Sequence, residues 1–157
     1  VYKRQGSRRS PIWTGGGVTF GPRNEKDFSK KINKKVRAKA LASTLSKKFT
    51  DGEMVFVDAF SFESPKTSSA KDAIKAIAIS SKHDDLATKK NNAALVVLNE
   101  RNEATEKSFR NFGNIAVANV KDINPVDLLT YKYVVMAEPA KALEVLESRI
   151  GTVANKE

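Results

Sequence analysis

The apolar residues downstream of residue 33 fall into short continuous runs separated by longer amphipathic stretches. A run of four to six apolar residues between polar positions is typical of a strand buried on both faces. The four strands predicted in this way cover residues 54–57, 93–98, 115–118 and 133–136. We expect them to contribute the sheet interior, in particular Val57, Leu95, Val97, Val117 and Val135.

The stretches between these runs place apolar residues three and four positions apart, which is the spacing of an amphipathic helix. The first predicted helix begins after Asn33, which can cap it, and ends at Asp51 and Gly52. Polar residues 81–92 predict a loop, whereas residues 103–112 and the turn after Asn124-Pro125 predict short helices. The apolar faces are Ala38, Leu41, Ala42, Leu45 and Phe49 in the first helix, Ala70, Ala73, Ile74, Ile77 and Ala78 in the second, Val126, Leu128 and Leu129 in the short turn, and Leu143, Leu146 and Ile150 in a last helix from Pro139 to Gly151.

Strands that alternate with helices predict the fold class. Such a pattern favours an α/β fold with a four-stranded, mostly parallel sheet flanked by helices on both faces. The predicted organisation is an extended basic arm at the N-terminus (residues 1–32), a globular core (residues 33–151) and a C-terminal tail (residues 152–157).

The arm has neither helical nor strand periodicity, and it concentrates the positive charge of the chain. The first 50 residues contain 14 of the 28 lysines and arginines and only two acids, Glu25 and Asp27. Since the whole chain has a net charge of +10, the remainder is slightly acidic. A basic, glycine- and proline-containing segment joined to a near-neutral domain indicates a polyanion partner, most simply nucleic acid.

Several features of the arm and of the first helix suit nucleic acid. Lysine and arginine neutralise phosphates and release counterions, Trp13 can stack on unpaired bases, and glycines 15–17 permit close backbone approach and positive φ. Cations in the first turn of a helix cost roughly 0.3–1 kcal/mol each unless a phosphate docks there, and Lys34 and Lys35 occupy that turn. Two alternatives remain open. The arm could be a solvated tail without a partner, and Lys34 and Lys35 could be exposed lysines whose small energetic cost the helix tolerates. The predicted binding residues are Lys3, Arg4, Arg8, Arg9, Trp13, Gly15, Gly16, Gly17, Arg23, Lys30, Lys31, Lys34, Lys35 and Arg37.

Catalytic, metal and membrane signals do not stand out in the sequence. There is no cysteine, no apolar stretch approaching the roughly 20 residues of a spanning helix, and no apolar segment typical of a secretory signal in residues 1–20. The only histidine, His83, lies in a polar loop, and Asp58 follows a strand without a visible catalytic partner. We therefore expect no enzyme, cofactor, metal site, small-molecule substrate or membrane partner. An enzyme with the arm as a lid would need a nucleotide-binding pocket at the carboxyl ends of the strands.

The arm also carries a recognisable motif. Gln5-Gly6-Ser7, Arg9-Ser10-Pro11-Ile12-Trp13, Gly15-Gly16-Gly17-Val18 and Phe20-Gly21-Pro22 closely resemble the extended-loop signature of the bacterial uL4 family of large-subunit ribosomal proteins. The resemblance continues from about residue 4 to residue 151, through Lys34-Lys35-Val36-Arg37, Pro65-Lys66-Thr67, Leu98-Asn99-Glu100, Arg110-Asn111 and Asp127-Leu128-Leu129. The Gly-Arg-Ala that precedes Gln5 in the family is not there, so we expect this chain to be N-terminally incomplete and to hold the returning half of the loop.

The resemblance implies a structural protein of the large ribosomal subunit. Its basic loop would bind large-subunit rRNA and line part of the nascent-peptide exit tunnel, and it would support subunit assembly beside neighbouring ribosomal proteins. The implied location is the ribosome in the cytoplasm, with an organellar ribosome still open. A different class also fits the composition, namely a general nucleic-acid-binding module with a basic arm.

Overall fold

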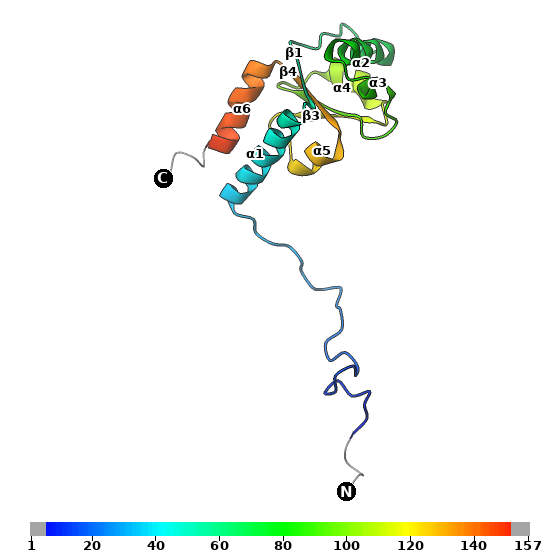
Figure 1. The fold of residues 1–157 in the computed structure, drawn as a ribbon, viewed down its shortest axis with the longest axis vertical. Helices are drawn as coiled ribbons and strands as arrows, with labels where there is room; N and C mark the ends of the chain where they lie inside the picture. Colours follow the sequence, from blue (N-terminus) through cyan, green and yellow to red (C-terminus); the bar gives the residue numbers. More distant parts are fainter. Residues whose placement is uncertain (1–5, 152–157) are drawn as a thin grey trace. The chain divides into compact units, whose positions relative to one another are not determined.

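The computed structural model describes residues 6–151 of the chain, which divides into two compact units, residues 1–31 and residues 32–157. In the second unit, a four-stranded sheet lies between two layers of helices (Figure 1). The predicted α/β class is therefore confirmed, and the strand pairs are all parallel.

The sheet has the strand order β1-β4-β2-β3. The two central strands are buried along their whole length, as expected for apolar runs covered on both faces. Val57 and Val117, predicted as interior, are only partly buried because they lie on the edge strands, whereas Leu95, Val97 and Val135 are buried. The strands are β1 (Met54–Val57), β2 (Ala94–Leu98), β3 (Ile115–Asn119) and β4 (Tyr133–Ala137).

One face of the sheet is covered by α2 (Thr67–Ser81), α3 (Asp85–Thr88) and α4 (Glu103–Arg110). Their apolar residues, including Ile74 and the fully buried Phe109, pack on the side chains of this face. The prediction of a loop over residues 81–92 is wrong for α3. The fully buried Leu86 anchors that short helix, a role that a single apolar residue among polar neighbours does not reveal.

The opposite face is covered by α1 (Lys34–Thr50), α5 (Pro125–Thr130) and α6 (Pro139–Gly151) (Figure 1). The connection from β2 to β3 passes through α4 on the first face, and the connection from β3 to β4 passes through α5 on this one. The chain therefore leaves the carboxyl ends of β2 and β3 toward opposite faces. In α/β sheets, such a divergence opens a crevice between the two strand ends.

Three predicted helix faces need correction. Phe49 is exposed because it lies at the end of α1, beyond Leu45, the last α1 residue of the core. Leu143 is half exposed because α6 faces the sheet with Ala142 and Leu146, and Leu143 is rotated about 100° from Ala142 around the helix. In α5, only Leu128 is buried, whereas its predicted companions Val126 and Leu129 point to solvent.

Candidate nucleic-acid interface

Residues 7–17 of the first unit fold into a series of tight turns. The amide of Ser10 donates to the carbonyl of Ser7 (2.9 Å), and the amide of Trp13 donates to that of Ser10 (3.1 Å). The amide of Gly16 donates to the carbonyl of Trp13 (2.9 Å), and the amide of Gly17 closes the series by donating to that of Arg9 (2.9 Å). We call residues 7–17 the turn segment. Its hydrogen bonds fix the backbone on which Arg8, Arg9 and Trp13 are displayed.

Two of the predicted glycines are required by this geometry. Gly15 has φ 81°, in the left-handed region that favours glycine. A Cβ on Gly16 would lie 1.9 Å from the carbonyl oxygen of Ser10, which no side chain can tolerate. Gly16 therefore makes a close backbone contact within the turn segment, and the approach of these glycines to a nucleic acid stays a prediction.

The side chains of the first unit are displayed rather than packed. Ile12 is 92% exposed and Phe20 is 82% exposed, and Trp13 is about half exposed. Arg8, Arg9, Arg23, Lys30 and Lys31 are exposed as well, and none of them forms an ion pair with a residue that the structure describes. Their positive charges are therefore available to a partner.

One acid of this unit is engaged locally. Asp27 accepts hydrogen bonds from the backbone amide of Ser29 (2.8 Å) and from its hydroxyl (2.9 Å). The backbone hydrogen bond from Ser29 is the main reason that the pKa of Asp27 is lowered. Nearby, the ammonium group of Lys26 lies 5.2 Å from the centre of the Phe28 ring. Asp27 thus stabilises a local turn through Ser29 and forms no ion pair with the basic residues near it in the described sequence.

The second group of predicted residues lies at the start of α1. Asn33 occupies the capping position, as predicted, but its side chain makes no capping hydrogen bond, and no acid lies in the first turn. Lys34, Lys35 and Arg37 are exposed there. The first amides of a helix lack internal acceptors and carry the positive end of the helix dipole. With lysines added, this terminus is suited to a phosphate.

Further along α1, neighbouring lysines have different environments. Lys47 is exposed and pairs with Asp51, one turn away. The side chain of Lys48 is only 11% exposed, pairs with Glu53, and donates to the carbonyls of Tyr131 (3.0 Å) and Lys132 (2.8 Å). Lys48 therefore ties α1 to the segment before β4, and not every lysine of the basic region is available to a partner.

The structure thus brings some of the predicted residues together and separates others. Arg8, Arg9, Trp13 and the three glycines share the turn segment, and Arg23, Lys30 and Lys31 lie on the irregular chain that follows it. Lys34, Lys35 and Arg37 belong to the second unit, and Lys3 and Arg4 lie outside the described residues.

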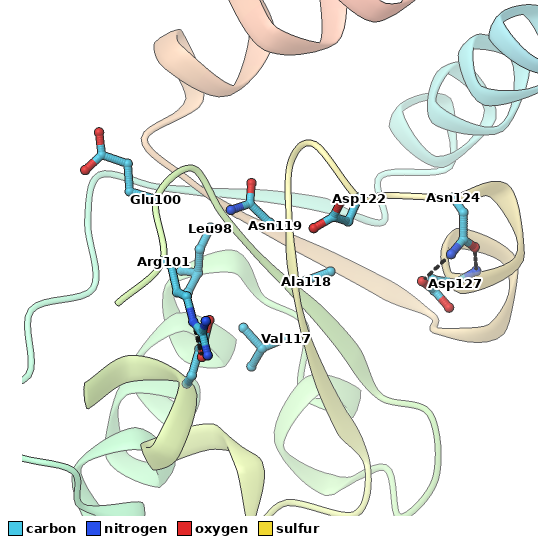
Figure 2. A pocket seen from close by; sticks show the side chains of 10 residues that line it. Leu98, Glu100, Arg101, Val117, Ala118, Asn119, Asp122, Asn124 and Asp127 are labelled. Carbon is cyan, nitrogen blue, oxygen red and sulfur yellow. Dashed lines mark hydrogen bonds and ion pairs between the residues drawn. The ribbon is translucent and has the colours of Figure 1, made fainter. Parts of the chain in front are cut away.

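A crevice at the carboxyl ends of β2 and β3 was not predicted from any motif. It has a volume of about 540 Å³ and carries the carboxylates of Glu100, Glu106, Asp122 and Asp127. Arg101 pairs with Glu106 (3.3 Å). Figure 2 shows Asp127 beside Asn124, whose side-chain nitrogen donates to its carboxylate (2.7 Å). Because four acidic residues and a single basic residue line it, the crevice disfavours phosphates and does not fit the nucleotide pocket that an enzyme with a lid would need.

The described part of the chain holds neither a metal-binding cluster nor a membrane-spanning helix. Between residues 6 and 151, no three His, Cys, Asp or Glu side chains are grouped so that they could hold a metal ion. In the same range, no helix combines the length and the apolar character needed to cross a bilayer.

Comparison with known proteins gives one consistent family. A family model described as the ribosomal protein L4/L1 family matches residues 3–149. The chain is 35% identical over 147 residues to the large ribosomal subunit protein uL4 of Desulfotalea psychrophila, covering 94% of this chain and 63% of that protein. It is 37% identical to the uL4 proteins of Oceanobacillus iheyensis, over 91% of this chain and 64% of the relative, and of Finegoldia magna, over 92% and 63%. The chain therefore spans less than two thirds of the length of these relatives.

Proposed function

The chain belongs to the ribosomal protein L4/L1 family, and on that premise we propose that it is a structural component of the large ribosomal subunit that binds large-subunit rRNA. The contacts would be made by the exposed basic residues of residues 6–31 and by the N-terminus of α1. We further propose that it acts without catalysis, on cytoplasmic ribosomes, in subunit assembly and beside the exit tunnel, with neighbouring ribosomal proteins as partners.

The observation that carries this proposal is the display of side chains in the first unit. Arg8 and Arg9 are exposed and unpaired among the described residues, on a backbone fixed by the turns around Gly15 and Gly16. Trp13 and Phe20 present exposed aromatic surface in the same unit. Basic side chains bind phosphates, and exposed rings stack on unpaired bases, which are the features that proteins read in folded RNA.

A filter-binding salt titration against the 5′ domain of large-subunit rRNA, with duplex DNA as competitor, tests the proposal. We expect tight binding at low salt, a steep loss of affinity as salt rises, and a preference for the rRNA. Indifference between rRNA and duplex DNA would favour the general nucleic-acid-binding module. Absence of binding at low salt would contradict both.

Paired substitutions show which surface makes the contacts. The double substitution Arg8→Ala/Arg9→Ala, and separately Lys34→Ala/Lys35→Ala, should each lower the slope of log affinity against log salt by roughly 1.4–1.8, because about 0.7–0.9 counterions are released for each phosphate contact. The charge-matched control is Lys71→Ala/Lys75→Ala on the exposed face of α2. An equal loss of slope in this control would mean that net charge, and not the proposed surface, determines binding.

A further inference from the structure

A second polar cavity adjoins the crevice at the carboxyl edge of the sheet. It has a volume of about 330 Å³ and shares Leu98, Glu100 and Arg101 with the crevice in Figure 2. The segments after β2 and β4 and the first turn of α4 supply its other walls. Because Thr105 of α4 lines it, we call it the Thr105 cavity.

Two oxygen atoms in this cavity are buried without a hydrogen-bond partner. Thr105 is fully buried, and its hydroxyl oxygen makes no hydrogen bond within the described residues. The side-chain nitrogen of Asn99 donates to the carbonyl of Glu138 (3.0 Å), while the Oδ1 atom of the same amide has no partner. Buried polar atoms are nearly always paired, so two such atoms around one cavity indicate a missing ligand. Both atoms can accept a hydrogen bond, so the ligand should be a donor.

The charge around the cavity indicates that this donor is cationic. Glu100, Glu103 and Glu138 line the cavity with a single basic residue, Arg101. Glu103 pairs with Lys107 outside this lining (2.6 Å), whereas Glu100 has no ion pair among the described residues. Arg101 is 82% exposed and engages Glu106 instead. The Oε2 atom of Glu138 is also buried, and it is paired with Lys141 (2.8 Å). A positively charged group with several N–H donors would therefore match both the charge and the unpaired oxygens.

We propose that this edge of the sheet binds an arginine side chain from an extended basic segment of a partner protein. A guanidinium is planar and carries five N–H donors in a fixed fork, so it can donate to more than one acceptor at once, whereas an ammonium is a point charge. The adjoining crevice, with Asp122 and Asp127, provides acids for further basic residues of the same segment. The site is a protein-binding site, and it is independent of the proposed rRNA contacts.

Calorimetric titration of the full chain with peptides tests the site. The probe is a nine-residue peptide with three Gly-Arg-Ser repeats and blocked ends, and the comparison is the same peptide with lysine in place of arginine. We expect the arginine peptide to bind about tenfold more tightly, since the fork of donors is lost in lysine. Equal binding of the two peptides, or no binding of either at low salt, would overturn the proposal. Equally tight binding of N-acetylarginine amide would overturn the assignment to a protein partner in favour of a small guanidinium compound.

Substitutions locate the binding in the cavity. Thr105→Val keeps the shape of the side chain and removes the unpaired hydroxyl, so it should weaken the arginine peptide about fivefold to tenfold while leaving the melting temperature unchanged or raised. Glu100→Gln should weaken the peptide as well. The matched control is Glu144→Gln, an exposed position of α6 that lines neither cavity.

The outcomes distinguish a specific peptide site from unspecific charge attraction, and they distinguish peptide binding from rRNA binding. Unchanged affinity in Thr105→Val would mean that water, and not a guanidinium, satisfies the hydroxyl, and would overturn the proposal. An equal loss in Glu100→Gln and Glu144→Gln would have the same consequence, because the attraction would then be unspecific. The Arg8→Ala/Arg9→Ala protein should keep its peptide affinity whatever happens to its rRNA affinity, so the two proposals can fail separately.

Discussion

The two units of this chain differ in the burial of their apolar residues. In the core, Phe109 and Leu95 are buried and hold helices against a parallel sheet. In residues 6–31, Ile12 and Phe20 are exposed, and the backbone is ordered by hydrogen bonds between neighbouring turns. Burial of apolar area is the main stabilising term of a fold, so we expect the core to be the stable unit, whereas the turn segment lacks that term.

The same contrast appears among the basic residues. Arg8 and Arg9 have no ion pair in the described part of the chain, whereas Lys48 is enclosed and holds two carbonyls and a carboxylate. Positive charge alone therefore does not identify a nucleic-acid contact. Exposure and the absence of an internal partner distinguish the residues that can bind phosphate from those that stabilise the core.

The largest expected effect comes from a core substitution. Phe109 is fully buried, and its ring packs edge-on against those of Phe60 and Phe62, with 5.5 Å and 5.9 Å between the ring centres. Phe109→Ala should lower the free energy of unfolding by roughly 3–5 kcal/mol, measured by urea denaturation, because it leaves a cavity. The control Phe20→Ala should leave the free energy of unfolding unchanged. A comparable loss in this control would show that the first unit is packed like the core.

The next effect tests the two neighbouring lysines. Lys48→Met should destabilise the core by roughly 1–3 kcal/mol in thermal or urea unfolding, because it leaves Glu53 without its partner and two carbonyls without a donor. Lys47→Met, at an exposed position of the same helix, should leave the stability nearly unchanged, because a solvent-exposed ion pair contributes little. If both substitutions had the same effect, burial would not distinguish structural lysines from available ones.

The core was largely predictable from the sequence because its pattern is repeated. Each strand contains an uninterrupted run of at least four apolar residues, and α2 keeps its apolar spacing from Ala70 to Ala78, so the local pattern alone locates these elements. The wrong predictions concern residues whose burial depends on tertiary contacts. The burial of Leu86 and the exposure of Phe49 depend on which neighbours reach them, and no local pattern records that.

The candidate interface was predictable in part. The density of charge and the glycines indicated the arm, and the positive φ of Gly15 follows the expectation for glycine. The contact between Gly16 and Ser10 depends on a fold of the turn segment that has no periodicity. The Thr105 cavity was not predictable, because its walls come from segments that are distant in sequence and lie together only at the carboxyl edge of the sheet.

A smaller effect tests whether the turns of residues 7–17 matter for binding. Gly16→Ala would place a Cβ against the carbonyl of Ser10 and should open the turn segment. We expect rRNA affinity in filter binding to fall about tenfold, equivalent to about 1.4 kcal/mol, with no change in the melting temperature of the core. The control is Gly21→Ala, where a Cβ meets no atom within 4 Å. An unchanged affinity in Gly16→Ala would show that the charges act without the turns.

The smallest expected effect is the response of the core to acid. A hydrogen bond from Lys132 lowers the pKa of Asp85, and hydrogen bonds from Lys107 and Lys141 lower the pKa of Glu103 and that of Glu138. A carboxyl group whose pKa is lower in the folded state stabilises the fold above its unfolded pKa, near 3.8 for aspartate and 4.5 for glutamate. That contribution is lost as the pH falls through the lowered values.

The melting temperature should therefore be nearly constant from pH 7 to about pH 5 and should fall at lower pH, more gently in high salt because these pairs are exposed. Asp85→Asn should reduce the decrease, since it removes one of the titrating carboxyl groups. Asp72→Asn, at an exposed residue of α2 without an ion pair in the described chain, should leave it unchanged. The prediction concerns the core alone, because the only lowered pKa within residues 6–31 belongs to Asp27, whose partner is the adjacent Ser29. A melting temperature that rises on acidification below pH 5 would contradict the assigned pairs and would indicate that repulsion between carboxylates at the crevice dominates instead.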